Sequence, residues 1–484
     1  MNRYKILSLI RFILGFTFLC LYGLIFVGVI QLTPLAKIQF IPAIFNLKNA
    51  VLLSFFIVFG HLILTVVFGR IYCSFLCPFG FLQDLIVLWR RNFSYRKVSW
   101  FLTIFLAFVF VISIFYSTFL FGFLDPYSLY GKFWSLIIKP AFLIVNNGLH
   151  FLLPFIQNLR IYELSLWLIF VFLLYFSFIF SFSFFLGRFF CNFLCPVSAV
   201  LRVFSLKTIV RLSIDNTKCI RCMKCEKECP ALCIDLKNQY IDFSRCLLCL
   251  RCFNCPTHAI DFRTSLKTKN SKKEFFNLSK GFILFLLARN KLFAFNDYRK
   301  LRRLPSPPGS ISLEHLKKNC VSCLLCVSHC PSKVLKPSFD EYGIDGIFMP
   351  VMNYPKSFCI YECNVCGSVC PTGAIKPISI EEKSKIQIGR VKLVKEKCIV
   401  YRDKVDCGAC SEVCPTKAVF MVEYEGRLFA PETETNYCVG CGACENVCPA
   451  LPEKAIYVEG HKIHNKAIIR KEKKSTEKLE DFPF

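Results

Sequence analysis

The stretch CIRCMKCEKECP, residues 219–230, places four cysteines in the spacing Cys-x2-Cys-x2-Cys-x3-Cys-Pro. Bacterial ferredoxins use this spacing: three thiolates on one loop hold a [4Fe–4S] cluster, and the fourth reaches a neighbouring cluster. Five further quartets follow in the C-terminal half of the chain, which has 484 residues and 30 cysteines. The spacing therefore predicts a chain that carries several iron–sulfur clusters.

Two of the further quartets repeat this spacing, three vary it, and every quartet ends in Cys-Pro. Zinc ribbons use separated cysteine pairs, and disulfide frameworks belong to small secreted chains, so both fit this clustering less well. We expect six [4Fe–4S] clusters. The predicted ligands are Cys219, Cys222, Cys225 and Cys229; Cys246, Cys249, Cys252 and Cys255; Cys320, Cys323, Cys326 and Cys330; Cys359, Cys363, Cys366 and Cys370; Cys398, Cys407, Cys410 and Cys414; and Cys438, Cys441, Cys444 and Cys448.

The N-terminal part of the chain is strongly apolar. Four uncharged runs, 12–32, 50–69, 98–124 and 164–187, are each long enough to cross a hydrocarbon core of roughly 30 Å. A fifth stretch, 133–156, is interrupted by Lys139, Pro140 and other polar residues, and we interpret it as re-entrant or interfacial. The expected fold is a membrane α-helical bundle of four transmembrane helices, followed by α+β ferredoxin modules of the bacterial type.

Basic residues indicate how the bundle is oriented. They follow the second and fourth runs, which places those loops in the cytoplasm of a bacterial-type inner membrane. An even number of spans then puts both termini, and all six quartets, on the cytoplasmic side, because no run after Gly187 is long enough to cross again. These residues are Arg70, Arg90, Arg91, Arg96 and Lys97, and then Arg188, Arg202, Lys207 and Arg211.

The formal net charge of +27 does not require a nucleic-acid partner. Part of it is the charge bias of cytoplasmic loops, and anionic clusters offset another part. Much of the rest lies in residues 263–303, where apolar side chains alternate with lysines and arginines. This stretch is either a linker that lies on an anionic membrane surface or an ordinary basic helix packed on protein.

An internal repeat ends the second and fourth apolar runs. GRIYCSFLCP, residues 69–78, returns as GRFFCNFLCP, residues 187–196, which implies a duplicated two-helix unit. It would gather four thiols at the cytoplasmic edge of the membrane. These thiols, called the repeat thiols below, have either a redox or metal-binding role or a packing role, and they are Cys73, Cys77, Cys191 and Cys195.

Three other residues stand out. His61 lies in the middle of the second run, where an ionisable group is a candidate quinone-site residue or haem ligand, although a hydrogen bond to a neighbouring helix is the simpler interpretation. Cys20 and Cys233 lie outside every quartet, and we expect them to be buried thiols rather than ligands. No nucleophile-and-base pattern accompanies them, so the chain is predicted to carry electrons rather than to make bonds.

The two repeat elements, together with LDPYS at 124–128, resemble the NapH-type membrane ferredoxins of quinol dehydrogenases. The stretch 307–448, with PPG at 307–309, CPTGAI at 370–375 and CVGCG at 438–442, resembles the NapG or MauM type of four-cluster polyferredoxin. The resemblance implies a fusion of the two that serves as a component of a quinol dehydrogenase. Its partners would then be a quinol and a ferredoxin-type or reductase protein. NapG-type proteins carry a twin-arginine export signal, whereas this module has neither that signal nor an expected crossing before it.

The expected organisation is a transmembrane domain at 1–211, a two-cluster ferredoxin domain at 212–262, a basic linker at 263–306, a four-cluster domain at 307–461 and a disordered charged tail at 462–484. In the two-cluster domain, Cys229 and Cys255 would each ligate the neighbouring cluster. In the four-cluster domain, the resemblance suggests that the outer runs pair and the inner runs pair, with pairing of sequential runs as the alternative.

Two functions from different classes follow from these features. The first is an electron-transfer protein that passes electrons between a quinol or membrane partner and a cytoplasmic redox protein. The second is a reductase or assembly factor, in which the clusters drive dithiol or metal chemistry at the repeat thiols.

Overall fold

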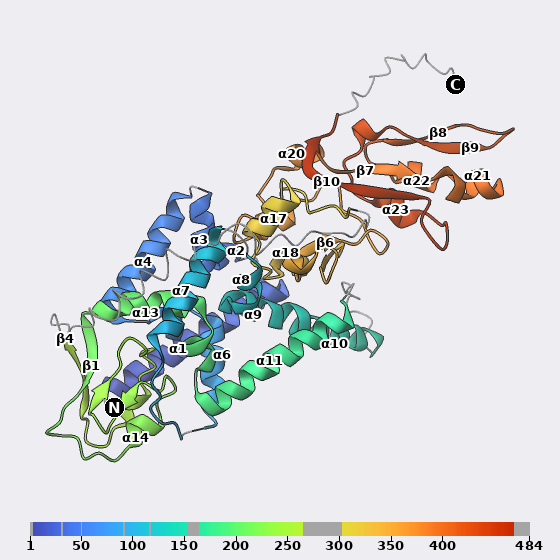
Figure 1. The fold of residues 1–484 in the computed structure, drawn as a ribbon. Helices are drawn as coiled ribbons and strands as arrows, with labels where there is room; N and C mark the ends of the chain where they lie inside the picture. The colour runs from blue at the N-terminus through green and yellow to red at the C-terminus, as the bar shows by residue number, and fades with distance from the viewer. Residues whose placement is uncertain are drawn as a thin grey trace, which may run out of the picture.

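A helical domain with a cysteine-rich module at each end forms the structure, which is a computed structural model (Figure 1). It describes residues 3–30, 32–49, 51–90, 92–115, 118–152, 164–264 and 303–468. We call residues 210–264 the two-cluster module and residues 303–468 the polyferredoxin module. Most of the linker expected at 263–306 lies outside the described residues.

The helical domain contains long apolar helices joined by short helical turns. Its elements are α1 (Arg3–Val27), α2 (Thr33–Ala36), α3 (Phe40–Lys48), α4 (Leu52–Phe68), α5 (Tyr72–Phe75), α6 (Pro78–Val87), α7 (Trp100–Phe115), α8 (Phe119–Leu124), α9 (Pro126–Phe133), a π-helix (Trp134–Ile138), α10 (Lys139–Leu152), α11 (Leu166–Leu186), α12 (Phe189–Phe193), α13 (Pro196–Phe204) and a 3-10 turn (Ser205–Lys207).

Three helical segments are long and apolar enough to cross a membrane, by length and composition, among the described residues: Ile6–Val27, Pro126–His150 and Leu166–Leu186. The first and third correspond to the first and fourth expected spans. The expected second and third spans are the shorter helices α4 and α7, of 17 and 16 residues. Residues 133–152 of the stretch expected to be interfacial continue the helical segment that begins at Pro126, and residues 153–156 lie outside the described part of the chain.

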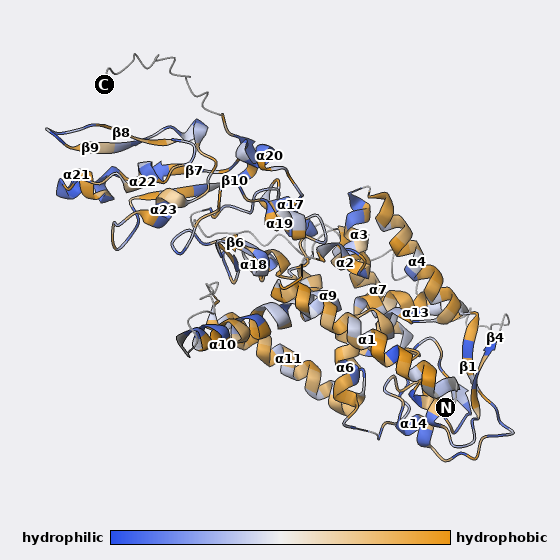
Figure 2. Cartoon of the chain, turned by 180° about the vertical axis from the view of Figure 1, so that it is seen from behind, coloured by the Kyte–Doolittle hydropathy of each residue, from blue (hydrophilic) through white to orange (hydrophobic). Residues whose placement is uncertain are grey.

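The outer surface of the helical domain is apolar. Leu52 on α4, Phe101 on α7 and Leu166 on α11 are 71%, 69% and 83% exposed. Figure 2 shows hydrophobic residues along α1, α4, α7 and α11, whereas the polyferredoxin module mixes polar and apolar residues. Such a surface is stable in lipid and costly in water, so the helical domain is associated with a membrane.

The two-cluster module is closed by the antiparallel pair β1 (Val210–Ile214) and β4 (Ile260–Thr264). Inside this pair lie α14 (Lys224–Lys227), the hairpin β2 (Ile234–Asp235) with β3 (Tyr240–Ile241), and a 3-10 turn (Arg251–Asn254). The strand pair brings the two ends of the segment together, so both cysteine runs are held within one small unit.

The polyferredoxin module alternates short helices with strand pairs. Its elements are α17 (Leu313–Asn319), α18 (Leu325–His329), β5 (Leu335–Pro337), β6 (Pro350–Met352), α19 (Val365–Val369), α20 (Ile380–Ser384), β7 (Ile386–Leu393), α21 (Ile399–Asp403), α22 (Ala409–Glu412), β8 (Val419–Glu423), β9 (Phe429–Thr433), α23 (Ala443–Val447) and β10 (Ile456–Lys466), with 3-10 turns at Ile344–Gly346, Lys395–Lys397 and Thr435–Tyr437.

Strand β10 pairs with β7 as far as Lys466, opposite Ile386. Residues 462–466 were expected to belong to a disordered tail, and this expectation is wrong for them. Asn465 and Lys466 pair with β7, and His464 donates to the Ile311 carbonyl, so backbone hydrogen bonds outweigh the charged composition of the segment. Residues 469–484 lie outside the described part of the chain.

The two modules contact opposite ends of the long helices. Near the start of α1, Arg11 donates to the carbonyl of Cys249 over 3.3 Å, and just after its end Gly28 lies against His329. A helix rises about 1.5 Å per residue, so these two contacts are roughly 25 Å apart.

The segments next to the other three helices make similar contacts. At the end of the polyferredoxin module, Asn46 on α3 donates to the Pro371 carbonyl over 2.6 Å, Thr118 just before α8 donates to the Lys317 carbonyl over 2.6 Å, and the rings of Phe172 on α11 and Phe348 lie 6.3 Å apart. Near the opposite end, Phe93 and Arg188 donate to the carbonyls of Lys227 and Pro230 in the two-cluster module, and Ile209, just before β1, donates to the Val66 carbonyl of α4.

The two modules thus lie at opposite ends of the helical domain, whereas the sequence predicts that both face the cytoplasm. That prediction rests on the absence of an apolar run after Gly187 long enough to cross again. In the structure the chain leaves the two-cluster module at Thr264 and is next described at Arg303, in the module at the opposite end.

Candidate functional site

Four of the six cysteine loops share one backbone conformation. In four quartets the second and fourth residues after the first cysteine have positive φ, as at Ser322 and Leu324, or at Gly440 and Gly442. This geometry turns backbone N–H groups toward the sulfur atoms: Ser322 donates to Cys320 Sγ over 3.4 Å, and Gly440 donates to Cys438 Sγ over 3.3 Å. Such a concave loop of N–H groups suits an anionic cluster. The quartets that begin at Cys359 and Cys398, whose spacing varies most, lack it.

The six cysteine runs form three consecutive pairs, and in each pair a strand hairpin joins the two runs. Hairpin β2–β3 lies between Cys229 and Cys246, β5–β6 between Cys330 and Cys359, and β8–β9 between Cys414 and Cys438. A hairpin reverses the chain, so each run lies beside the next one. The six runs therefore form three neighbouring pairs.

In the two-cluster module the fourth cysteines are exchanged as expected. One cavity is lined by Cys229 from the first run and by Cys246, Cys249 and Cys252 from the second. Cys255 lies within electrostatic range of Cys225, together with Cys219 and Cys222. Each run thus contributes three thiols to one group and one thiol to the other.

In the polyferredoxin module the exchange runs between sequential runs. A second cavity is lined by Cys398, Cys407 and Cys410 together with Cys448. Cys414 lies within electrostatic range of Cys444 and its run. The suggested outer and inner pairing is therefore wrong, because it would separate runs that a hairpin holds together.

The first two runs of that module follow the same rule. Cys326 has Cys320, Cys323 and Cys370 as electrostatic neighbours, and Cys366 has Cys359, Cys363 and Cys330. All three dicluster units are thus built in one way, with a hairpin between two runs that exchange their last cysteine.

The donor sets fit iron–sulfur clusters better than single ions. Within the described residues no three His, Cys, Asp or Glu side chains converge closely enough to hold one metal ion. A [4Fe–4S] cluster keeps its four thiolates further apart, on separate iron atoms. All 30 cysteines belong to the described part of the chain, and each is a free thiol there.

Burial also affects the protonation of these thiols. It raises the pKa of Cys225 to about 12, that of Cys410 to about 12 and that of Cys438 to about 11. These side chains are therefore protonated at neutral pH without a cluster. Because iron binds the thiolate, cluster insertion has to release their protons.

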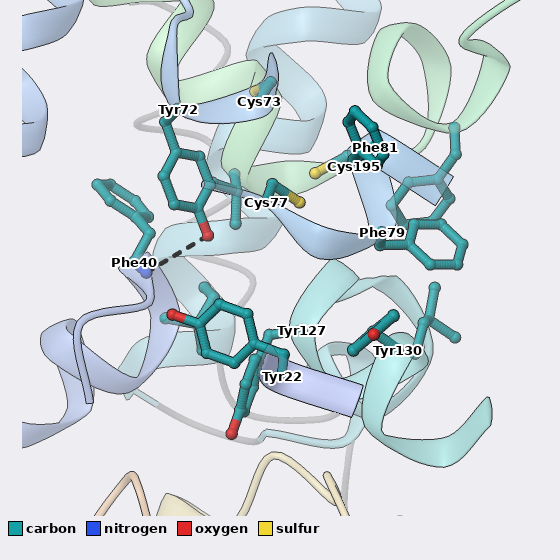
Figure 3. Close-up of a cluster of buried hydrophobic side chains, with 14 of the residues drawn as sticks. Tyr22, Phe40, Tyr72, Cys73, Cys77, Phe79, Phe81, Tyr127, Tyr130 and Cys195 are labelled. Carbon is teal, nitrogen blue, oxygen red and sulfur yellow. Dashed lines mark hydrogen bonds between the residues drawn. The ribbon is translucent and has the colours of Figure 1, made fainter. Parts of the chain in front are cut away.

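The repeat thiols come together inside the helical domain. All four are buried, with exposures of 4–6%, rather than lying at an open membrane edge. Cys77 caps α6 by accepting from the Gly80 N–H over 3.4 Å, and Cys195 caps α13 by accepting from the Ser198 N–H over 3.4 Å. In Figure 3 the sulfurs of Cys77 and Cys195 lie close to one another, with Cys73 above them.

The two repeats hold each other through their arginines. Arg70 of the first repeat donates to Asn192 and Ser198 of the second, and Arg188 of the second donates to the carbonyl of Cys73 over 2.6 Å. This reciprocal contact explains why both repeat elements carry an arginine at the second position, and the glycine before each arginine has positive φ.

Asp84 on α6 completes the contact, and sequence reasoning missed it. Its carboxylate accepts from Arg188 Nε over 2.7 Å, from Arg188 Nη2 and from Arg11 Nη2. It is 2% exposed. A lone acidic residue in the apolar stretch 78–88 was the signal that could have revealed it.

The remaining candidates are placed as follows. His61 is 6% exposed; its Nδ1 contacts the Ile57 carbonyl over 2.7 Å, and its Nε2 has no hydrogen-bond partner among the described residues. Its ring packs against Tyr72, with centroids 5.1 Å apart. Cys233 is buried with its sulfur 3.5 Å from Cys229 Sγ, and Cys20 is half-buried on α1.

The comparisons agree with these sites. The family described as "4Fe-4S binding domain" matches residues 50–96 and 168–212, which contain the two repeat elements. The family described as "4Fe-4S dicluster domain" matches residues 405–451, which span the last hairpin and its two runs. No solved structure matches the chain significantly.

Three relatives illustrate what the chain resembles. An uncharacterized protein of Methanocaldococcus jannaschii is 27% identical over 44% of this chain and 71% of its own length. The electron transport protein YccM of Escherichia coli strain K12 is 31% identical over 22% of this chain and 30% of its own length. The methylamine utilization ferredoxin-type protein MauM of Methylobacillus flagellatus is 32% identical over 20% of this chain and 41% of its own length.

Apolar helices and ferredoxin-type cysteine modules together define an iron–sulfur electron-transfer protein associated with a membrane. Among such proteins, the chain is similar to polyferredoxins of the NapH/MauM type.

Proposed function

We propose that the chain passes electrons between a quinol in the membrane and a soluble redox protein, through six [4Fe–4S] clusters held by the six cysteine quartets. The observation that carries this proposal is that the two modules contact opposite ends of the helical domain, at α1 and α11 and through the segments that flank α4 and α7. These helices then form a four-span bundle in an inner membrane, and electrons pass along it from one module to the other.

The orientation follows from the basic residues. Arg70, Arg90 and Arg96 lie at the end that contacts the two-cluster module, so this module faces the cytoplasm. The polyferredoxin module then faces the opposite side. The segment 265–302, which lies outside the described residues, joins the two modules.

His61 is the proposed quinol contact. A quinol has to lose protons when it is oxidised, and a buried imidazole with an open nitrogen is suited to accept one. Tyr72 and Gln39 border this position: Tyr72 donates to Gln39 Oε1 over 2.6 Å. His61→Leu should therefore slow quinol oxidation while the clusters stay reducible by a soluble reductant.

The experiment is a redox titration of the full chain, purified from membranes without oxygen and returned to lipid vesicles. The six quartets together predict about 24 iron atoms per chain. A menaquinol analogue should change the cluster absorbance, and a low-potential ferredoxin should drive the reverse reaction. Clusters that do not respond to quinol in either direction would refute the quinol-linked function, and about eight iron atoms or fewer would refute the six clusters.

The second function considered, dithiol or metal chemistry on an external substrate, requires the repeat thiols to be reached from outside. Their exposures of 4–6% argue against this. Burial at the centre of the helical domain instead favours a role in moving electrons.

A further inference from the structure

The repeat thiols lie between the two modules, where the proposed route has its longest gap. The contacts of the modules on α1 are roughly 25 Å apart. Electron transfer slows exponentially with the distance between carriers, so a gap of this length calls for an intermediate carrier. We propose that Cys73, Cys77, Cys191 and Cys195 together hold one further iron–sulfur cluster, which relays electrons across the helical domain. The inference rests on the proposed function.

The ligand count points to one shared site. Each segment that matches the "4Fe-4S binding domain" family contains only two cysteines, Cys73 with Cys77 and Cys191 with Cys195. One [4Fe–4S] cluster needs four thiolates. The two repeats meet face to face, and Cys195 has Cys191, Cys73 and Cys77 as electrostatic neighbours. The four ligands are thus available only when both repeats contribute.

The buried charges support an anionic occupant. Arg11, Arg70 and Arg188 are 0–3% exposed, and Asp84 is the one carboxylate that pairs with any of them among the described residues. Arg70 has only neutral partners there, and its Nε has none. Both Arg70 and Arg188 lie within electrostatic range of Cys73. Uncompensated buried cations are costly, and a [4Fe–4S] cluster on four thiolates, which is net anionic, would offset them.

The two helices that begin after Cys77 and Cys195 also support an anionic occupant. Cys77 and Cys195 are the N-cap residues of α6 and α13, helices of ten and nine residues. The N–H groups at the start of each helix therefore point at a sulfur atom, an arrangement that suits an anionic occupant.

A continuous chain of contacts links the site to the two-cluster module. Arg11 donates to the carbonyl of Cys249 and to Asp84, and Asp84 also accepts from Arg188. Arg188 then donates to the carbonyl of Cys73. One hydrogen-bonded path thus joins a predicted cluster ligand to a repeat thiol.

Aromatic rings extend from the site toward the polyferredoxin module. Tyr22 lies within electrostatic range of Cys77, and its ring packs against Tyr127 with centroids 6.4 Å apart (Figure 3). Tyr127 in turn lies within electrostatic range of Cys323 and Cys370, which belong to one predicted cluster. The next residue, Ser128, donates to the Val321 carbonyl over 2.6 Å.

The relay moves one electron at a time. A reduced cluster beside Cys249 is oxidised as the shared cluster is reduced, and the shared cluster is reoxidised by the cluster beside Cys323. No bond is made or broken, and the reverse flow uses the same carriers.

The test compares iron content in the full chain, purified and reconstituted without oxygen. The wild type should hold about 28 iron atoms, and the variant with all four repeat thiols replaced by serine about 24. Cys20→Ser, which removes another thiol of the helical domain, is the matched control and should keep the wild-type content. Equal iron in the wild type and the quadruple variant would overturn the proposal.

Two half-variants keep the test decisive if the quadruple variant does not fold. Cys73→Ser with Cys77→Ser, and Cys191→Ser with Cys195→Ser, should each remove the whole extra paramagnetic signal of the reduced protein, because the site is shared. Loss of half of it in each variant would indicate two separate sites and overturn the proposal. Quinol should still reduce the two-cluster module in these variants, while reduction of the polyferredoxin module slows at least tenfold; failure of quinol to reduce the wild type refutes only the proposed function.

Discussion

Replacing Asp84 by asparagine removes the one carboxylate that joins α6 to both α1 and the second repeat. The substitution keeps the shape of the side chain but leaves Arg11 and Arg188 without their counter-ion in a site where all three side chains are 0–4% exposed. Removing one partner of a buried ion pair costs about 3–5 kcal/mol, because the remaining charge stays desolvated.

This cost should be visible as a lower melting temperature. For a domain of roughly 200 residues, each kcal/mol shifts the midpoint by about 2–4 °C, so the expected decrease is about 6–20 °C. The assay is the fraction of protein that stays monodisperse in detergent after heating, followed by size-exclusion chromatography. Both proteins should be compared at the same iron content.

Asp215→Asn is the matched control. Asp215 also faces two cations, with Lys218 at 3.9 Å and Arg263 at 3.8 Å. These three side chains, however, lie at the surface of the two-cluster module. Surface ion pairs contribute little, so this variant should melt with the wild type. If Asp84→Asn melts with it too, the reasoning that the carboxylate holds the repeats together is refuted.

Three further predictions concern sidedness, cluster pairing and cluster assembly. A reporter fused after Phe484 should be active outside the cytoplasm, and one inserted after Asn238 inside it; activity of both on one side would contradict the two-sided arrangement. Cys448→Ser should remove the same spectroscopic cluster signal as Cys398→Ser, and the double variant should lose no more than either; loss of two different signals would restore the outer pairing. Because burial raises the pKa of Cys410 to about 12 and iron binds the thiolate, the rate of anaerobic cluster reconstitution should rise as the pH is raised from neutral, measured by the growth of cluster absorbance, whereas a rate that falls or stays constant would contradict the protonated state.

Much of this protein can be predicted from its sequence. Cysteine spacing is local, because a Cys-x2-Cys-x2-Cys loop can wrap a cluster without help from distant residues, and this identified the six quartets. The apolar runs and the two GR…CP elements are likewise local patterns, since helix length and burial in lipid depend on composition. The exchange of Cys229 and Cys255 also followed, because both runs lie within one short segment.

Tertiary structure decided what depends on distant contacts. The pairing of Cys448 with the run at Cys398 follows from hairpin β8–β9, whereas spacing alone is compatible with either pairing. The shared carboxylate of Asp84 required α1 and the second repeat to meet, at separations of 73 and 104 residues. The end of the helical domain at which each module docks also depends on distant contacts. Charge bias in loops orients a bundle but does not report where a module docks after the last recognised span, and the contacts of Gly28 and Thr118 with the polyferredoxin module provide that information.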